Sequence, residues 1–565
     1  MSKESLKKLN ALISNHSLDG YIIPKNDCFF TEQVKYDRLR LISDFSGSAG
    51  LAVVLKKKNF LFVDSRYTIQ ARLESGKNFK IFNIQEKLPK SLFKNITLGF
   101  DPNLFTYKQL SYFFGGRLKL KPIKENFIDR IFKKNQLKVE PFYSIPNGVV
   151  GESHYKKINL VSKYLQNMKA DFLYISAPEN VAWLLNIRGS DTPFSPIPNC
   201  NLILSKTKKF YLISERNKIN KLLLEKKIFL KKFLEKNNFK SFINTLKGKK
   251  FIVDNKTLSV FNENIIRSKF SIINNIDPCY YFKSRKNATE IKNMVQSHIQ
   301  DGVALTKFII WIKNLKKKKI TEIDAQKKLE NFRKKNKNYL YPSFNTIAGT
   351  GSNGAIVHYR ATKKTNKVIK KKDLFLCDSG GQYKYGTTDV TRTLCFDKQP
   401  KKIKDIFTLV LKGHIAVATS NLSNRDTGKK LDVQARRFLK KSRLDYGHGT
   451  GHGVGYFLNV HEGPQSISKL NNIKLKEGMI LSNEPGFYKE GKFGIRIENL
   501  VYVKKVNKKL FFTNLTLAPI DKDLINYKLL NKKEKDYLLN YHLLVYSKLS
   551  KYLNKNEKSW LIRNL

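Results

Sequence analysis

The chain has 565 residues, enough for about three or four domains of ordinary size with real hydrophobic cores. Its formal net charge of +61 favours contact with polyanions, but the lysines are spread in short clusters, without an arginine-rich arm, a zinc finger or an RNP-like motif. The five cysteines are odd in number and form no C-x-x-C pair, which argues against a disulfide framework and a thiolate zinc site.

The sequence shows no signal for a membrane. It lacks an apolar run of about 18 residues, the length that a membrane helix needs. The segment MSKESLKKLNALISNH also lacks the apolar core of a secretory signal. We therefore expect a soluble cytoplasmic protein that binds neither a membrane nor a specific nucleic acid.

Two similar α/β domains are predicted in the first half of the chain. In residues 1–145, YIIP, LAVVL and FLFVD are β-rich runs, and SLKKLNALISNH and SRYTIQARLES have helical apolar spacing. DGYII, LISDFSGS and NFLFVDSRY are echoed later by DFLYI, LLNIRGSD and KFYLISERN. The echo predicts a second domain of the same kind in residues 146–284. EPFYSIPNGVVGES and NNIDPCYYFKSRKN are the linkers.

A third domain is predicted in residues 285–565, with a C-terminal extension from about residue 510. Asn287 and Glu290 form a capping-box-like helix start. Ile291, Val295 and the apolar residues that follow at helical spacing then predict a long amphipathic helix.

The segment DLFLCDSGGQYKYGTTDVTRTLCF is typical of a β-hairpin, with two β-rich runs around a Tyr-Lys-Tyr-Gly turn. In such a hairpin Asp378 and Asp389 face each other across neighbouring strands. Seen alone, they are equally well turn or edge residues. If they do meet, the two carboxylates repel each other unless a cation lies between them.

Histidines gather in the same region. The chain has nine, and His358, His448, His452 and His461 lie within about a hundred residues of one another. His448 and His452 are four residues apart, as in a helical zinc pair, but the glycines of YGHGTGHGVG disfavour a helix and indicate a loop or irregular strand. A single histidine is more often a structural residue, whereas the clustering favours a functional site.

Two further carboxylates follow. Glu484 precedes Pro485, which favours an extended backbone, and strand alternation places Arg496 and Glu498 on one face. Together the candidate ligands are four carboxylates and one imidazole: Asp378, Asp389, His452, Glu484 and Glu498. This oxygen-rich set suits Mn²⁺, Co²⁺ or Mg²⁺ better than structural zinc, and four carboxylates offset the charge of two divalent ions.

These motifs occur in an order that resembles a known family. DSGGQY, TTDVTRT, GHGTGHGVG, NVHEGP, NEPGFY and IRIEN resemble the signature of the pita-bread metallopeptidases, which include aminopeptidase P, prolidase, methionine aminopeptidase and the metal-free creatinase. The long, three-domain aminopeptidases P resemble this chain most, because DGYIIPKND, FSGSAG, LLNIRGSD, SNGAIVHY, LTLAPID, YHLLV and WLIR extend the likeness over nearly its whole length.

The resemblance implies a mixed α/β fold and an activity. Two tandem creatinase-like α/β domains would precede a pita-bread catalytic domain with a curved antiparallel sheet. The enzyme would be a homodimer that releases the N-terminal residue of peptides with proline in second position. Its cofactor would be two divalent metal ions, with Mn²⁺ expected and Co²⁺ or Zn²⁺ as alternatives.

The resemblance also implies roles for individual residues. Asp378 and Asp389 would hold one ion, His452 and Glu484 the other, and Asp389 and Glu498 would bridge them. A water or hydroxide between the ions would attack the scissile carbonyl, and Glu484 would take its proton. Peptide binding and proton transfer would fall to His358, His448 and His461. Substrate contacts would also come from His452, Arg496 and, in the first domain, Arg66.

Alternatives remain at this stage. A prolidase shares the ligands but usually has one N-terminal domain, and creatinase lacks the metal set. A non-enzymatic relative that binds nucleic acid or protein would be expected to have lost ligands. Arg66 could instead be a surface residue paired with Asp64 or Glu74. Gly381 departs from the family's usual Ala or Cys after D-S-G, although it is not one of the expected ligands.

Overall fold

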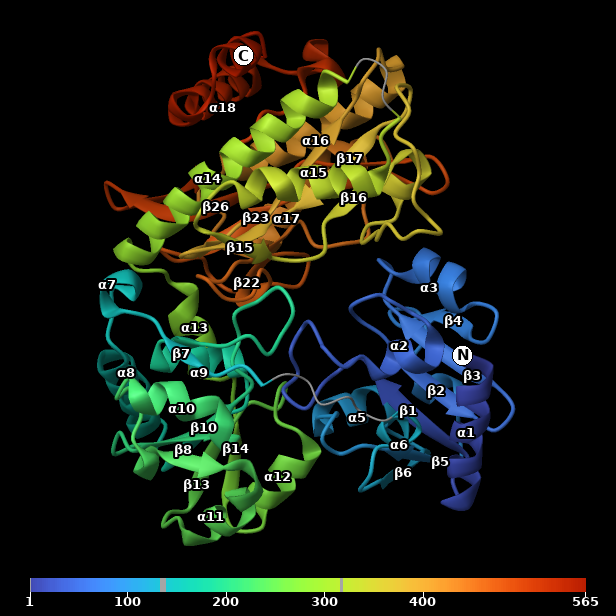
Figure 1. The fold of residues 1–565 in the computed structure, drawn as a ribbon, viewed down its shortest axis with the longest axis vertical. Coiled ribbons are helices and arrows are strands. Elements are labelled where there is room, and N and C mark those ends of the chain that lie inside the picture. Colours follow the sequence, from blue (N-terminus) through green and yellow to red (C-terminus); the bar gives the residue numbers. More distant parts are fainter. Residues whose placement is uncertain (1, 133–138, 316–318, 565) are drawn as a thin grey trace. The chain divides into compact units, whose positions relative to one another are not determined.

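The computed structural model describes residues 2–132, 139–315 and 319–564. They fall into two compact units, Met1–Tyr280 and Tyr281–Leu565 (Figure 1). None of the helices in the described ranges is both long and apolar enough to cross a membrane.

The first unit contains two sheets with the same topology. The first sheet has the strand order β4-β3-β2-β1-β5-β6 and the second has the order β12-β11-β10-β8-β13-β14. In each, the central strand pairs antiparallel on one side and parallel on the other: β1 with β2 and β5, and β8 with β10 and β13. The outermost pairs are parallel in both sheets. The predicted tandem repeat is therefore confirmed.

Each sheet is buried on both faces. Along β1, Tyr21 and Ile23 belong to one apolar core and Ile22 to another, as the two-residue repeat of a strand requires. The first sheet consists of β1 (Gly20–Pro24), β2 (Leu51–Leu55), β3 (Asn59–Val63), β4 (Lys80–Asn83), β5 (Thr97–Phe100) and β6 (Lys119–Pro122). Its helices are α1 (Ser2–Asn15), α2 (Arg38–Ser43), α3 (Thr68–Ser75), α4 (Pro89–Leu92), α5 (Tyr107–Phe114) and α6 (Phe127–Ile131).

The second sheet repeats this plan. Its strands are β8 (Phe172–Ile175), β10 (Asn201–Ser205), β11 (Phe210–Ser214), β12 (Phe233–Glu235), β13 (Lys250–Val253) and β14 (Ser271–Asn274). Its main helices are α8 (His154–Asn167), α9 (Pro178–Leu185), α10 (Arg216–Leu224), α11 (Phe239–Thr245) and α12 (Val260–Arg267). A short antiparallel pair, β7 (Tyr143–Ser144) and β9 (Ile187–Arg188), ties the preceding linker to this domain.

The second unit opens with the predicted long helix, which the structure confirms as α14 (Ala288–Lys313). Its N-terminus is closed by a reciprocal capping box between Asn287 and Glu290. Towards its C-terminal end, Leu305, Phe308 and Ile312 pack in one apolar core with residues of the central strands. Helix α15 (Glu322–Lys334) packs beside α14 and against strand β16.

The strands of the second unit form several short antiparallel sheets. One joins β15 (Tyr339–Pro342), β18 (Gly381–Tyr383) and β19 (Gly386–Thr387), and another joins β16 (Ile347–Thr350), β17 (Phe375–Ser379) and β20 (Val390–Leu394). The largest has the order β22-β21-β23-β26-β27. Its strands are β22 (Glu462–Ile467), β21 (Gly451–Gly453), β23 (Ile480–Asn483), β26 (Asn499–Val506) and β27 (Lys509–Asn514). Separately, β24 (Gly486–Lys489) pairs with β25 (Phe493–Arg496).

Helices cover these sheets. Helices α16 (Lys401–Ala418) and α17 (Gly428–Lys441) pack together, α16 against β23 and α17 against β22. The C-terminal helices α18 (Lys532–Leu549) and α19 (Lys555–Ile562) pack against α14, and α18 also contacts α16 (Figure 1). The C-terminal extension thus packs into the core of the second unit.

Gly302 sits inside α14 where the helix meets the C-terminal extension. A Cβ at this position would lie 2.3 Å from the backbone oxygen of Leu517 and 3.2 Å from its Cβ. Glycine in a helix normally costs about 1 kcal/mol relative to alanine. Here the close backbone approach requires it.

We therefore predict that Gly302→Ala destabilises the protein by about 1–3 kcal/mol, because overpacking outweighs the gain in helix propensity. Gly148→Ala is the matched control, since a Cβ in helix α7 (Asn147–Val150) would meet nothing within 4 Å. Calorimetric unfolding of both variants tests this. A Gly302→Ala protein as stable as the wild type would contradict the packing argument.

Candidate metal centre

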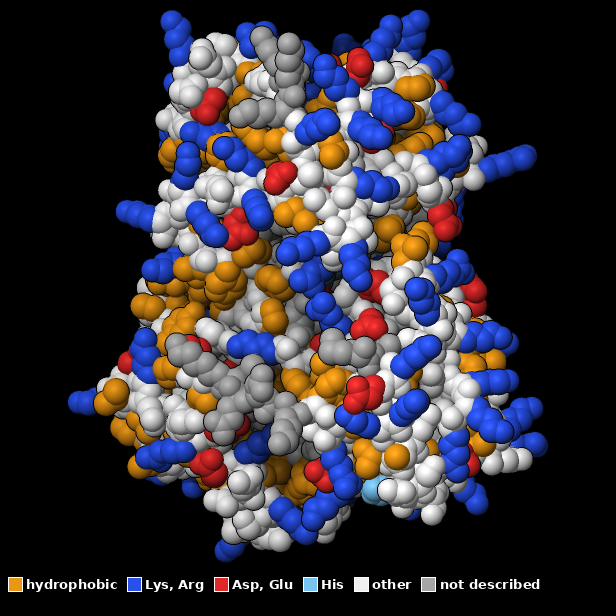
Figure 2. Space-filling view, turned by 45° about the vertical axis from the view of Figure 1, so that its right-hand side comes forward, with side chains coloured by type: hydrophobic (Ala, Val, Ile, Leu, Met, Phe, Trp, Pro, Cys, Tyr) orange, Lys and Arg blue, Asp and Glu red, His pale blue; other side chains and the backbone are white. Residues whose placement is uncertain are grey.

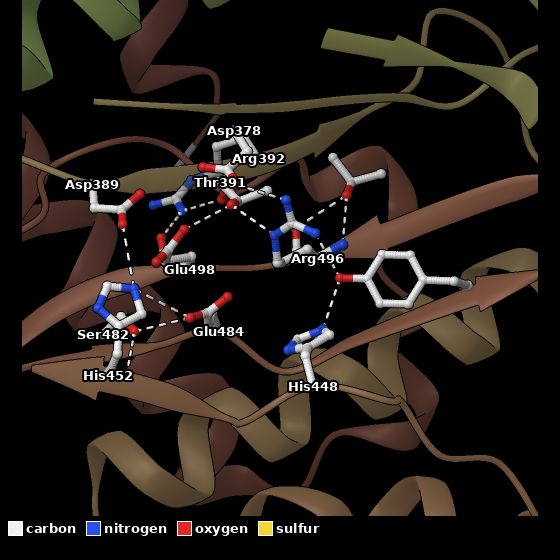
Figure 3. Close-up of polar contacts among 12 residues, drawn as sticks. Asp378, Asp389, Thr391, Arg392, His448, His452, Ser482, Glu484, Arg496 and Glu498 are labelled. Carbon is white, nitrogen blue, oxygen red and sulfur yellow. Dashed lines mark hydrogen bonds and ion pairs between the residues drawn. The ribbon is translucent and has the colours of Figure 1, made fainter. Parts of the chain in front are cut away.

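The five candidate ligands meet in one place in the second unit (Figure 3). Two overlapping groups offer ligand atoms that all lie within 4.8 Å of one another: Asp378, Asp389 and Glu498 form one, and His452, Glu484 and Glu498 form the other. Glu498 is common to both groups. We call these five residues the metal centre: Asp378, Asp389, His452, Glu484 and Glu498.

The hairpin positions the first two carboxylates. Strands β17 and β20 pair antiparallel, as predicted, and Asp378 lies opposite Thr391 in this register. Asp389 precedes β20 by one residue, so the two carboxylates are offset by two positions and do not stand directly opposite each other. The expected Tyr-Lys-Tyr-Gly turn connects two extra strands, β18 and β19, which pair in a different sheet together with β15. The hairpin therefore changes sheet between its two carboxylates.

The glycine-rich segment is irregular apart from the short strand β21 (Gly451–Gly453) and is not a helix, as predicted. His452 is the middle residue of β21, between β22 and β23. A Cβ on Gly451 would lie 1.9 Å from the oxygen of Ser482, so only glycine lets β21 come this close to β23. This approach brings His452 beside Glu484: the His452 N–H donates to Ser482 Oγ (2.9 Å), and Ser482 Oγ donates to Glu484 Oε1 (3.0 Å).

Arg496 and Glu498 do reach the same site, although only Arg496 lies in a strand. β25 ends at Arg496, and Glu498 sits in the short connection before β26. Ile495 and Ile497 are fully buried in an apolar core on the other side, as the alternation predicts. Thr391 Oγ1 donates to Glu498 Oε2 at 2.7 Å and so orients this carboxylate.

The four carboxylates are crowded, and Asp378, Asp389 and Glu498 are buried while Glu484 is partly buried. Burial, and then the charges of Asp389, Glu484 and Asp378, raise the pKa of Glu498 well above its usual range. Burial likewise raises the pKa of Asp389 to about 6, against the opposing hydrogen bond from His452, with Asp378 adding to the rise. Burial alone would lower the pKa of His452, but the contacts with Asp389 and Glu484 outweigh burial and raise this pKa to about 9. The centre is a strong attractor for positive charge.

Two carboxylate oxygens show where positive charge is lacking. Asp378 Oδ1 and Asp389 Oδ1 are buried, and neither has a hydrogen-bond partner among the described residues. A buried carboxylate oxygen without a donor is costly, and a cation is the ligand that satisfies it. Four carboxylates and one imidazole also match the hard, oxygen-preferring divalent ions. The residues present therefore fit a pair of divalent metal ions.

A buried arginine and a tyrosine extend the centre. Arg496 is 1% exposed, and its guanidinium donates to Asp378 Oδ2 (2.6 Å), Tyr488 Oη (2.6 Å) and Thr391 Oγ1 (3.1 Å). Tyr488 Oη also contacts His448 Nε2 at 2.9 Å, so His448 is linked to Asp378 through two side chains (Figure 3). Burial raises the pKa of Tyr488 to about 12, which keeps its hydroxyl protonated.

The remaining predicted residues are placed differently. The ring of His461 packs edge-on to that of His452, with centroids 4.2 Å apart, and it forms a further group with Asp389 and His452. His358 is partly buried in the segment after the turn Gly351–Ala355, and it belongs to none of the groups of potential ligands found among the described residues. Arg66 lies in the first unit, where its Nε and Nη2 donate to Asp64 (2.9 and 2.8 Å).

Several site residues are not evident from the sequence. Tyr488 has a signal, because it stands four residues after Glu484 in NEPGFY, but its partners His448 and Arg496 belong to other motifs. Glu462 follows His461 directly and is buried between two buried lysines, Lys283 (3.0 Å) and Lys286, which contact its two carboxylate oxygens. These ion pairs fix the start of β22 and hence the backbone next to His461.

The domains match known families in the same order as the fold. Residues 6–130 and 133–290 match models of the creatinase/prolidase N-terminal domain. Residues 292–505 match metallopeptidase family M24, and residues 508–565 match the C-terminal region of that peptidase family. The carboxylate-rich centre lies wholly within the M24 segment and has the ligand chemistry of a metallopeptidase.

Relatives extend over the full length. The chain is 36% identical to a protein of Laccaria bicolor named probable Xaa-Pro aminopeptidase P, over 99% of this chain and 92% of that one. It resembles the crystal structure of X-prolyl aminopeptidase from Caenorhabditis elegans, described as a cytosolic enzyme with a di-nuclear active site, with a TM-score of 0.92, 30% identity and coverage of 100% and 99%. The chain belongs to metallopeptidase family M24, and the resemblance to the long aminopeptidases P is confirmed.

A prolidase is a poorer match. The prolidase structure from Thermococcus sibiricus is 26% identical with a TM-score of 0.52, and the match covers 98% of that chain but only 65% of this one. About a third of the present chain has no counterpart there, in keeping with a second N-terminal domain.

The crowding of carboxylates leads to a prediction about stability. The folded-state pKa of Asp389 lies above its ordinary value, so its ionisation destabilises the fold, and the whole cost is present above about pH 6. In metal-free protein at about pH 8, Asp389→Asn should therefore raise the unfolding temperature. With Mn²⁺ added, the order should reverse, because the variant loses a ligand.

Asp378→Asn is the matched control, since it removes the same charge but breaks the 2.6 Å contact with Arg496. It should lower the unfolding temperature both with and without metal, because a buried guanidinium is left without its anion. Thermal scans in chelator and in Mn²⁺ measure all four cases. Two variants that respond alike in chelator would contradict the proposed difference between the two carboxylates.

Proposed function

We propose that the protein is a two-metal aminopeptidase that releases the N-terminal residue of peptides with proline in second position. The observation that carries the proposal is the convergence of Asp378, Asp389, His452, Glu484 and Glu498, with two buried carboxylate oxygens lacking any donor among the described residues. The full-length likeness to the Xaa-Pro aminopeptidases supports the substrate class.

We propose ligand roles that are compatible with the two groups of potential ligands. Asp378 and Asp389 would hold one ion and His452 and Glu484 the other, with Asp389 and Glu498 as ligands of both. We propose Mn²⁺ as the native ion, with Co²⁺ and Zn²⁺ as alternatives, because oxygen ligands dominate the set. When bound, two such ions polarise the scissile carbonyl and lower the pKa of the attacking water.

The chain's own groups supply positioning and proton transfer. Burial raises the pKa of Glu484, which suits a carboxylate that takes a proton from water and returns it to the leaving nitrogen. His358 and His461 bind peptide carbonyls. His448 moves a proton at Nε2, where the Tyr488 hydroxyl lies 2.9 Å away. Arg496 is enclosed by Asp378, Tyr488 and Thr391, so its influence on the substrate passes through Tyr488.

We further propose that the protein is a cytoplasmic homodimer that binds neither a specific nucleic acid nor a membrane. The similarity to a cytosolic enzyme supports the compartment. The net charge of +61 is not gathered into one patch on the face seen in Figure 2, where Lys and Arg are scattered among acidic, apolar and neutral side chains. A diffuse positive surface gives weak binding that salt removes, and not sequence-specific recognition.

The test of function is hydrolysis of a Xaa-Pro-Pro tripeptide beside its Xaa-Ala-Ala counterpart, with and without Mn²⁺. A prolyl imide has no N–H, so a site shaped for it leaves the N–H of other substrates unpaired, at about 1–3 kcal/mol. We predict a preference for proline in kcat/KM of about tenfold to a hundredfold. Equal kcat/KM for alanine would refute the Xaa-Pro assignment and leave the metallopeptidase assignment intact.

Arg66 allows a prediction about the first domain. We propose that its guanidinium engages the peptide beyond the scissile bond, an interaction present in ground and transition states alike. Arg66→Ala should then raise KM for tripeptides and longer substrates with little change in kcat. Arg72→Ala, an exposed arginine on α3 in the same domain, is the control. KM values that do not change across a series of peptide lengths would leave Arg66 as the partner of Asp64 alone.

A further inference from the structure

A second buried arginine lies beside the metal centre. Arg392 on β20 is 2% exposed, and no carboxylate in the described parts of the chain forms an ion pair with it. Its guanidinium donates instead to neutral oxygens. Such a group acts less as a charge partner than as a rigid fork that fixes the separation of the atoms it contacts.

One end of the fork holds the backbone of the metal centre. Arg392 Nη1 donates to the carbonyl oxygens of Thr391 (2.9 Å) and Glu498 (2.6 Å). The Glu498 N–H donates back to the Thr391 carbonyl at 3.1 Å, and Thr391 Oγ1 holds the Glu498 carboxylate. Figure 3 shows Arg392, Thr391 and Glu498 together on one side of the centre. The position of the shared ligand Glu498 therefore depends on Arg392.

The other end of the fork is held by the C-terminal region. Arg392 Nε donates to the Pro519 carbonyl (3.0 Å), and Nη2 donates to the Ala518 carbonyl (2.9 Å) and to Tyr541 Oη (2.9 Å). These acceptors belong to residues 508–565, beyond the segment that carries the ligands. Asn499 Oδ1 completes the set of Nη2 acceptors at 2.8 Å.

Tyr541 joins helix α18 to this arrangement. It is 3% exposed, and its hydroxyl accepts from Arg392 and donates to the Ala518 carbonyl at 2.8 Å. The neighbouring His542 Nε2 accepts the Ile520 N–H at 3.1 Å. Helix α18 thus holds residues 518–520 against the guanidinium, and a single hydroxyl connects the C-terminal helix to the fork.

We propose that the C-terminal region is a positioning element for the metal centre and that Tyr541 acts on Glu498 through Arg392. The inference rests on the proposed two-metal function. Loss of the Tyr541 hydroxyl removes one of the three acceptors around Nη2 and also the donor that holds the Ala518 carbonyl, so the guanidinium and residues 518–520 shift towards their remaining partners. Because Nη1 spans the Thr391 and Glu498 carbonyls, that shift displaces a ligand that both ions share.

The test compares Tyr541→Phe with the wild type and with Tyr546→Phe, using full-length protein. Tyr546 lies on the same helix, is partly buried against the same core, and its hydroxyl has no hydrogen bond to any described residue. Bound manganese per chain is counted after equilibration at a series of buffered free Mn²⁺ concentrations, well below the unfolding temperature of every variant. We expect half-occupancy of Tyr541→Phe to need about tenfold more free Mn²⁺, with Tyr546→Phe unchanged.

Arg392→Lys is made alongside, because it retains the charge but cannot span the two carbonyls, and it should shift the binding curve in the same direction. Wild-type and Tyr541→Phe binding curves that coincide, each reaching two Mn²⁺ per chain, would overturn the inference and leave the proposed function standing. A Tyr541→Phe variant that has a lower unfolding temperature but an unchanged Mn²⁺ binding curve would likewise overturn the inference. A wild type that binds no Mn²⁺ would instead refute the two-metal function itself.

Discussion

The mutual repulsion of three buried carboxylates and a partly buried fourth, Glu484, is the constraint on which the catalytic unit depends. Glu498, Asp389 and Glu484 all have raised pKa values, with burial as the largest cause and neighbouring carboxylates adding to it. Such a cluster is stable only if cations share the site. The protein provides Arg496 on one side and His452 within the cluster, and the unsatisfied oxygens of Asp378 and Asp389 leave room for more positive charge.

The rest of the unit holds these groups together against their repulsion. The ligands come from segments spread over more than a hundred residues, so each must be fixed by its own sheet register: β17 with β20, and β21 with β23. Backbone approaches that only glycine permits, as at Gly451, draw the strands together. Arg392 then ties the strand that follows Asp389 to the backbone of Glu498. The strand pairing, the close backbone approaches and the Arg392 hydrogen bonds of this unit thus hold like charges near one another.

The sequence is informative where chemistry is local. Two-residue alternation places Arg496 and Glu498 on one face, the glycines around His452 exclude a helix, and the Asn287–Glu290 box begins the expected helix. The tandem domains show through an echo of short motifs, since equivalent strands need similar residues. What the sequence cannot show is pairing at long range. Tyr488 with His448, Arg392 with Tyr541, and Glu462 with Lys283 and Lys286 are joined by tertiary structure alone. The predicted hairpin is correct in its strands but not in its register, because the chain changes sheet inside it.

The large positive surface charge does not balance the negative centre. At physiological ionic strength, exposed charges are screened beyond about 8 Å, so lysines scattered over the surface contribute little to the potential at a buried site. Arg496 acts differently, because it is 1% exposed and lies 2.6 Å from Asp378, where water and salt do not screen the contact. One buried arginine therefore does more for the centre than the whole excess of surface lysines. The same reasoning explains why the charge of +61 predicts solubility and weak, salt-sensitive attraction to polyanions, whereas the chemistry follows from a few buried residues.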